Sequence, residues 1–375
     1  MSQLEELVRE AVRDLADRGR TPNLGAAALA LARRGRLRTR LAAIVAALTG
    51  ILAAVPVGLL ATSGTPRPRP TPSVSGTATV QALRLDREHP FTVEGMQLVS
   101  YHSPAGSPSA FVVLGGRYQQ VPFARVDRDP VSGRYATLTG FNGEAGLVEP
   151  VTGALRPWHI PAGKMPMNLT WRADGKQILL SLGDETKPQA GFAIVDVATG
   201  QLQARTITDP ALSRAGAWAD LTWDPAGNLL LPVLEPGTSN PRVRNIKVLT
   251  PALQDHGTLN IPARVFGPRS WSPDQRHLIG LGTAPGGDPN LVTWRVYDAV
   301  SGRAVAALDG DLGAWWIDNE RLLVARRDTA STVLLKVCDL AGRALRTYEV
   351  DGDDVAATST EGGSGISGLD FQRAG

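Results

Sequence analysis

Histidine is the side chain from which a metal site or an acid–base site is most readily built, and this chain has five. No two of them are closer than 13 residues, and they stand at His89, His102, His159, His256 and His277. That spacing excludes a local metal-binding pair. The sequence also has no Gly-x-Ser-x-Gly elbow, no Gly-x-x-x-x-Gly-Lys-Ser/Thr phosphate loop and no His-Glu-x-x-His motif. We therefore assign no catalytic, cofactor-binding or metal-binding residue from sequence and expect no cofactor. A composite site, made by residues far apart in the chain, stays open.

Two acidic stretches and a set of tryptophans are the other side chains with chemical potential. The acids at 309–311 and 351–354 lack the twelve-residue calcium-loop pattern, so we expect solvated turns there. All eight tryptophans lie between residues 158 and 316. Trp315 and Trp316 must face opposite sides if they lie in a strand. Four tryptophans recur at a regular spacing described below. The other four are candidates for lining a ligand or partner surface: Trp158, Trp218, Trp294 and Trp315.

Composition restricts the class of protein. Of 375 residues, 43% are hydrophobic and 20% are charged, which is enough apolar material for a core. The net charge of +3 is too balanced to predict a nucleic-acid partner. A single cysteine, Cys338, excludes an intramolecular disulfide framework and a Cys-rich zinc site, and we expect it to be a small buried residue of a strand.

One segment has the length and composition of a membrane span. Residues 41–61 contain no charged side chain, and 21 residues of helix extend ~31 Å, close to the ~30 Å of a hydrocarbon core. Five arginines lie between residues 33 and 40, against two at 67 and 69. Since positive charge stays on the cytoplasmic side, we expect the N-terminus inside the cell and residues beyond 61 outside.

A cleaved signal peptide is the alternative for the same segment. Its apolar core is usually about 7–15 residues behind a short basic region, whereas here 40 residues precede a 21-residue core. A retained anchor is therefore favoured. Small residues recur every four positions in the span, a pattern that also permits self-association of two spans: Ala42, Ala46, Gly50, Ala54 and Gly58.

The first 40 residues predict two short helices. Apolar residues at helical spacing mark residues 4–15, and Thr21-Pro22 is a suitable start for a second helix over 22–38. Short cytosolic segments before one span resemble those of bacterial anti-sigma factors. The zinc-binding kind is excluded, because this segment has no His and no Cys. A zinc-free helix pair that binds a cytosolic partner and a simple amphipathic stretch both remain open.

Residues 62–77 are rich in Pro and Gly and predict an extended linker, after which the pattern of residues 78–375 predicts an all-β domain.

A unit of about 50 residues recurs within residues 78–375. Each copy has a tryptophan, a turn and an apolar run, with the tryptophans at Trp171, Trp223, Trp271 and Trp316. A second marker is an acidic residue and a glycine three or four positions apart, as in Val195-Asp196-Val-Ala-Thr-Gly200, which we interpret as the hairpin between the two outer strands. Four strands per unit are typical of a propeller blade.

The stretch Trp271-Ser272-Pro273-Asp274, followed by Leu278-Ile279, resembles the repeat of TolB-like six-bladed propellers. The general plan resembles actinobacterial single-pass membrane proteins with a TolB-like or WD-repeat-like ectodomain. Only this copy keeps Ser-Pro-Asp intact, and Gln275 stands where glycine is usual. The resemblance implies a fold and no particular activity.

The predicted fold is thus an all-β propeller of six blades, with seven as the alternative, preceded by a helical segment and one transmembrane helix. Five blades have markers between 126 and 350. Strands near 96–101, 110–114 and 118–123 supply an incomplete sixth, whose missing strand we place at 365–371. That strand would join both ends of the domain and close the ring.

Three functions are compatible with this plan. We favour an extracytoplasmic binding module for a protein, a glycan or another envelope component. The second is transmembrane signalling, with residues 1–40 holding a cytosolic partner. The third is a hydrolase or lyase with a composite site in the central funnel, which a cluster of His and acidic residues there would favour.

Overall fold

The chain divides into two compact units, Met1–Val74 and Ser75–Gly375. The computed structural model describes residues 80–102, 109–139, 144–149, 151–184, 191–209, 220–235, 242–283, 292–328, 332–351 and 368–374, all in the second unit. The predicted helices at 4–15 and 22–38, the span at 41–61 and the linker at 62–77 lie outside these ranges. Within the described ranges, no helix is long and apolar enough to cross a membrane.

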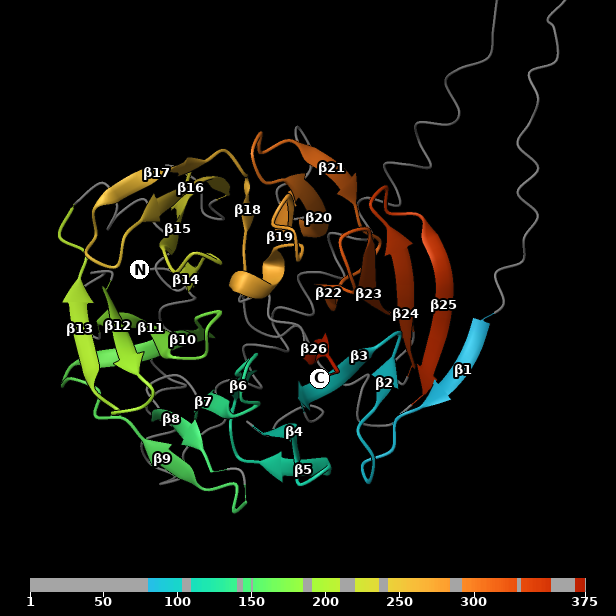
Figure 1. Ribbon diagram of the computed structural model, residues 1–375, viewed down its shortest axis with the longest axis horizontal. Helices are drawn as coiled ribbons and strands as arrows, with labels where there is room; N and C mark the ends of the chain where they lie inside the picture. The colour runs from blue at the N-terminus through green and yellow to red at the C-terminus, as the bar shows by residue number, and fades with distance from the viewer. Residues whose placement is uncertain are drawn as a thin grey trace, which may run out of the picture. The chain divides into compact units, whose positions relative to one another are not determined.

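The described residues form six sheets, which stand as blades around one axis (Figure 1). Each blade is named here by its strands. Blade 1 contains β2 (Thr92–Val93), β3 (Met96–His102), β4 (Ala110–Leu114), β5 (Arg117–Val121) and β26 (Leu369–Arg373). Blade 2 contains β6 (Arg125–Arg128), β7 (Tyr135–Leu138), β8 (Ala145–Val148) and β9 (Leu155–Pro157). Blade 3 contains β10 (Lys164–Trp171), β11 (Gln177–Asp184), β12 (Gly191–Asp196) and β13 (Leu202–Thr206).

The other three blades follow in chain order. Blade 4 contains β14 (Thr222–Trp223), β15 (Leu229–Leu234), β16 (Val243–Leu249) and β17 (Asp255–Leu259). Blade 5 contains β18 (Ala263–Arg264), the 3-10 turn η2 (Pro268–Ser270), β19 (His277–Thr283), β20 (Val292–Asp298) and β21 (Ala304–Ala307). Blade 6 contains β22 (Gly313–Trp316), β23 (Arg321–Arg327), β24 (Thr332–Asp339), β25 (Ala344–Asp351) and β1 (Val80–Arg84). The prediction of six blades is confirmed, and the alternative of seven is wrong.

Local turn chemistry explains the hairpins that join the outer strands. In blade 3, Asp196 Oδ1 accepts hydrogen bonds from both the backbone N and the Oγ1 of Thr199, each at 2.8 Å. Asp298 and Ser301 repeat this arrangement in blade 5 at 2.7 Å. An Asp side chain that caps its own turn holds the chain in the reversed direction. The Asp and Gly markers of the sequence are therefore confirmed as these hairpins.

The apolar runs are continuous because each sheet is buried on both faces. In β11, Ile178 and Leu180 join a cluster shared with blade 2, whereas Leu179 between them joins a cluster shared with blade 4. Successive residues of a strand point to opposite faces. One strand thus supplies two cores, and the hydrophobic core of the ring is a series of clusters between neighbouring blades.

The repeated tryptophans fasten each blade to the one before it. Trp171 packs in the cluster between blades 2 and 3, and its Nε1 donates to the carbonyl of Asp127 in blade 2 at 2.9 Å. Trp316 likewise donates to the carbonyl of Ser270 in blade 5 at 2.7 Å. Trp223 is fully buried between blades 3 and 4. Trp271 differs, since it is only partly buried and follows η2 instead of ending an inner strand.

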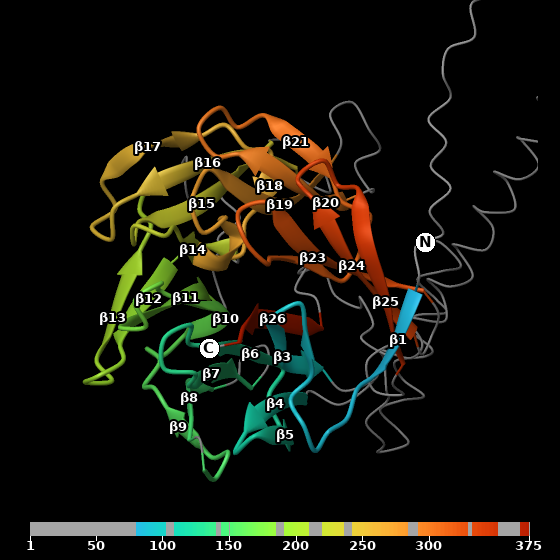
Figure 2. The ribbon, with the colours of Figure 1, turned by 45° about the vertical axis from the view of Figure 1, so that its right-hand side comes forward.

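The ring is closed by the last strand, as the sequence predicted. β26 pairs antiparallel with the inner strand β3 of blade 1, with Leu369 opposite Tyr101 and Phe371 opposite Leu98. Figure 2 shows β26 beside β3. Side chains of β26 also reach both neighbouring blades, because Gln372 donates to the carbonyl of Arg128 at 3.1 Å and Arg373 to that of Ile317 at 2.7 Å.

A second closure was not predicted. β1 adds to the outer edge of blade 6 by parallel pairing with β25, from Val80 opposite Thr347 to Arg84 opposite Asp351 (Figure 2). The chain then enters blade 1, where Glu94 accepts hydrogen bonds from Arg346 and Tyr348 of blade 6. Both ends of the described domain therefore bind blade 6 to blade 1.

The closing strand should carry a measurable share of the stability. Phe371 is 2% exposed and packs edge-on against Trp315 and Phe91. We expect Phe371→Ala to lower the free energy of unfolding of the full chain by about 3–5 kcal/mol, measured by urea denaturation followed by tryptophan fluorescence. Val300→Ala, at a side chain that is 95% exposed, is the control and should change it by less than about 0.5 kcal/mol. A loss below about 1 kcal/mol for Phe371→Ala would show that β26 does not hold the ring closed.

Candidate functional site

A pocket of about 130 Å³ lies among the inner strands, near the axis of the ring. Five of the six blades contribute to it, and blade 4 does not. Its principal polar residues are Ser100, His102, Arg125, Asp127, Asn168, Thr170, Arg269 and Asp370. Its principal apolar residues are Leu169, Phe266, Ile279, Trp294, Ala314 and Trp315.

The pocket owes its central feature to a break in the repeat. In blade 5 the inner strand β18 is only two residues long, and η2 follows it after Gly267. Gly267 has φ +95°, and a Cβ on it would lie 2.9 Å from Thr170 Cγ2 of blade 3. Only glycine fits this approach without strain. The turn directs Arg269 into the middle of the ring.

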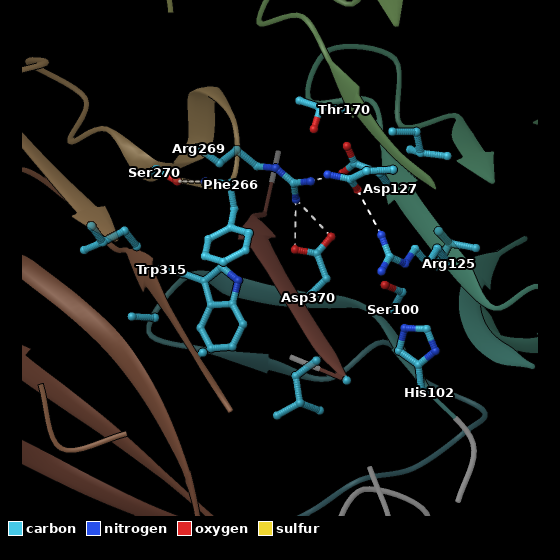
Figure 3. A pocket seen from close by; sticks show the side chains of 18 of the residues that line it. Ser100, His102, Arg125, Asp127, Thr170, Phe266, Arg269, Ser270, Trp315 and Asp370 are labelled. Carbon is cyan, nitrogen blue, oxygen red and sulfur yellow. Dashed lines mark hydrogen bonds and ion pairs between the residues drawn. The ribbon is translucent and has the colours of Figure 1, made fainter. Parts of the chain in front are cut away.

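Arg269 joins three blades through two carboxylates. Its Nη1 lies 2.9 Å from both carboxylate oxygens of Asp370 on β26, and its Nη2 donates to Asp127 on β6 (Figure 3). Asp127 Oδ2 also accepts the backbone N–H of Trp171 at 3.2 Å. Charge-assisted bonds of this kind are strong and directional, so the two carboxylates are held in place before any ligand arrives.

Arg125 and His102 form the opposite side of the pocket, beside Ser100 (Figure 3). Arg125 Nη1 donates to the carbonyl of Met167 at 2.8 Å and to Asn168 Oδ1 at 3.3 Å. Burial lowers the pKa of Arg125, and the charge of Asp220 partly offsets this. Burial also lowers the pKa of His102, and the positive charge of Arg125 adds to that effect. His102 is therefore neutral near pH 7.

A second ion pair lies close to this side. Arg264 Nε is 3.1 Å from Asp220 Oδ2. Burial raises the pKa of Asp220, while Arg264 and Arg125 act in the opposite direction. Among the charged residues named here, three arginines are matched by three aspartates. The pocket is thus polar and close to electrically neutral.

Aromatic rings make up the remaining wall. Phe266 and Trp294 pack with ring centroids 5.2 Å apart, and Trp315 packs edge-on against Phe371 of the closing strand at 5.0 Å. Figure 3 shows Phe266 and Trp315 on the side away from Arg125 and His102, with Arg269 and Asp370 between. A ligand here would meet an apolar surface on one side and hydrogen-bonding groups on the other.

The histidines and tryptophans singled out from the sequence lie in different parts of the structure. Of the five histidines only His102 lines the pocket, and His89 makes an exposed pair with Asp86. Trp294 and Trp315 line it, Trp158 is buried between blades 2 and 3, and Trp218 lies outside the described residues. Trp315 and Trp316 face opposite sides, as predicted.

The acidic stretches at 309–311 and 351–354 are only partly within the described residues. Asp309 forms ion pairs with Arg326 at 2.8 Å and with Lys336 at 2.6 Å, as a turn residue would. Asp353 and Asp354 lie outside the described residues. Over the described ranges, no group of three or more His, Cys, Asp or Glu side chains is placed to hold a metal ion.

Sequence reasoning missed the charged residues of the pocket. Arg125, Asp127, Arg269 and Asp370 belong to no motif, and 245 positions separate Arg125 from Asp370. One signal was present, since Gly267 and Pro268 stand shortly before Trp271, and a Gly-Pro pair is a typical turn signal. That interruption marks the turn that carries Arg269.

No family model and no curated protein matches this chain. Solved structures do match at low identity. A putative TolB from Agrobacterium tumefaciens is 13% identical with a TM-score of 0.43, over 64% of this chain and 86% of that one. The β-propeller domain of Myceliophteria thermophila Cps50 (Swd1) is 15% identical with a TM-score of 0.36, over 65% and 77%. Dipeptidyl peptidase 4 from Porphyromonas gingivalis is 11% identical with a TM-score of 0.36, over 67% and 33%. The fold assignment rests on the six sheets themselves.

The neutral state of His102 makes the stability of the domain dependent on pH. Its folded pKa lies below the ordinary value of 6.5, so the unfolded chain takes up this proton at higher pH than the folded chain does. The contribution of His102 to stability is therefore present above pH 6.5 and is lost as pH falls towards the lowered pKa. We expect the wild type to melt at a higher temperature than His102→Gln at about pH 7.5, and we expect this difference in melting temperature to become smaller as the pH is lowered to about 5.

His89 provides the control for this titration. Its hydrogen bond and ion pair with Asp86 raise its pKa, so any contribution to stability is present below pH 6.5 and lost as pH rises. His89→Gln should therefore show a small difference of the opposite trend. If the difference in melting temperature between the wild type and His102→Gln does not vary with pH, His102 is not a buried, neutral histidine.

Proposed function

We propose that this chain is a membrane-anchored, extracytoplasmic binding module whose ligand site is the central pocket. One observation carries the proposal: the pocket brings together polar groups already held in position by neighbouring blades and an aromatic wall. Arg269, Asp127 and Asp370 form one ion network before any ligand is present. A site ordered in advance loses little conformational freedom on binding, which favours affinity. The ligand belongs to a protein or to another component of the cell envelope.

A hydrolase or lyase is the second candidate, because His102 lies in the same pocket as Asp127 and Asp370. Such a site would need a carboxylate or imidazole placed to transfer a proton to substrate. Both carboxylates instead accept hydrogen bonds from Arg269. Binding therefore ranks above catalysis. The signalling alternative stays a prediction, since residues 1–40 lie outside the described residues.

The extracytoplasmic placement predicts which thiols a membrane-impermeant maleimide can reach in intact cells. Cys338 is 2% exposed, and burial raises the pKa of its thiol to about 11, so it should react slowly. We expect Val300→Cys, at a 95% exposed side chain, to be labelled in intact cells. Ser2→Cys should be labelled only after permeabilisation. Labelling of Val300→Cys that requires permeabilisation would contradict this topology.

The pocket itself is tested by photo-crosslinking in native membranes. A photoreactive phenylalanine analogue is placed at Val126 or at Trp315, both in the pocket, and at Val300 on an outer turn as the control. We expect a light-dependent adduct from the pocket positions and none of the same mass from position 300. Its mass distinguishes a protein from an envelope polymer. Replacing Trp315 could itself weaken ligand binding and so prevent an adduct. The variant at Val126 keeps Trp315 and therefore controls for this effect. No adduct from either pocket position, or the same adduct from all three, would overturn this site.

A further inference from the structure

The geometry points to one uncharged sugar ring as the group that the pocket binds, an inference that rests on the proposed function. Size is the first argument. The pocket holds about 130 Å³, somewhat less than the roughly 150 Å³ cavity that accommodates benzene. One sugar ring would therefore fill it with part of its hydroxyl edge outside, whereas a peptide segment of several residues would have to remain mostly outside.

Charge is the second argument. The pocket wall carries two positive side chains, Arg125 and Arg269, and two negative ones, Asp127 and Asp370. His102 is neutral near pH 7, since burial and Arg125 lower its pKa. Just outside, Arg264 is paired with Asp220. A charged ligand would bring an uncompensated charge into a partly buried site, which costs free energy. The balance of the wall thus favours a neutral ligand.

The two sides of the pocket supply the third argument. A sugar ring has an apolar C–H face, and its edge carries hydroxyl groups that both donate and accept hydrogen bonds. Trp315 and Phe266 provide an aromatic surface for such a face. Asp370, between the two sides, offers carboxylate acceptors, and Arg125, on the side of His102 away from the rings, offers guanidinium donors (Figure 3). A purely apolar ring would leave these polar groups without new partners.

Trp294 adds a third aromatic ring to the pocket wall. It is 6% exposed and packs against Phe266 with ring centroids 5.2 Å apart. Its Nε1 is fully buried, as is the Nε1 of Trp223 in the core between blades 3 and 4. Trp294 therefore contributes to the pocket through its ring, whereas Trp223 lies outside the pocket and serves as a control.

The direct test titrates the full-length chain, held in a detergent without a sugar headgroup. The probes are glucose, galactose, mannose and N-acetylglucosamine, with glucuronate, adenosine and an uncharged blocked dipeptide as competitors of other classes. Binding is followed by tryptophan fluorescence and by saturation-transfer NMR. We expect at least one neutral sugar to bind with a Kd of about 1 mM, as suits one small ring. Glucuronate, adenosine and the dipeptide should bind at least about tenfold more weakly.

Variants of tryptophans inside and outside the pocket connect this binding to the site. Trp223→Phe, in the core between blades 3 and 4, should leave sugar binding unchanged. Trp315→Ala should weaken binding by about tenfold or more, and Trp315→Phe should restore most of it. Thermal melting of each variant verifies folding. Equal effects of Trp315→Ala and Trp223→Phe on sugar binding would overturn the assignment of the sugar to this pocket.

Failure of this inference is distinguishable from failure of the proposed function. If no neutral sugar binds but the pocket photo-crosslinks to an envelope component, the sugar assignment is overturned and the binding site stands. If glucuronate, adenosine or the dipeptide binds more tightly than every neutral sugar, the sugar assignment is likewise overturned and the binding site stands. If no sugar binds and neither pocket position forms an adduct, both are overturned. Selective binding of a neutral sugar that depends on Trp315 supports both.

Discussion

Burial of every blade on both faces is the constraint on which the rest of the structure depends. A four-stranded sheet that stands between two others must be apolar on both sides, so Ile178, Leu179 and Leu180 can follow one another without a polar residue. Hydrophobic burial then acts between blades and not within them. No blade has a core of its own, and the ring is stable only when each sheet has two neighbours.

The same constraint makes ring closure decisive, because an open ring would expose one apolar face at each end. β26 completes blade 1 from the inside, and β1 extends blade 6 on the outside. Both ends of the domain are thereby fixed where blade 1 meets blade 6. The closing strand also brings Asp370 to the axis, so the element that stabilises the fold contributes a carboxylate to the pocket. Stability and the candidate site share one element here.

The site arises where the repeat is broken. In blades 2, 3, 4 and 6 the inner strand ends at or near the repeat tryptophan or its equivalent, whereas in blade 5 η2 intervenes and projects Arg269 towards Asp127 and Asp370. Buried charges require compensation, and here each named arginine has a carboxylate partner or neighbour. The resulting pocket is pre-ordered, nearly neutral and half aromatic. These are properties of a binding site for a small polar ligand, and they do not by themselves select a reaction.

The sequence by itself determined the local and periodic features of this protein. Regular tryptophans, markers of an acidic residue and a glycine, and continuous apolar runs predicted six blades, and an incomplete first blade placed the closing strand at 365–371. Each of these signals acts over a few residues or repeats along the chain. Only the tertiary structure decided the pocket. Arg125, Asp127, Arg269 and Asp370 lie in three different blades and have no common spacing, so nothing in their order indicates that they meet. Their meeting depends on the closure of the ring, which brings the inner strands of distant repeats to one axis.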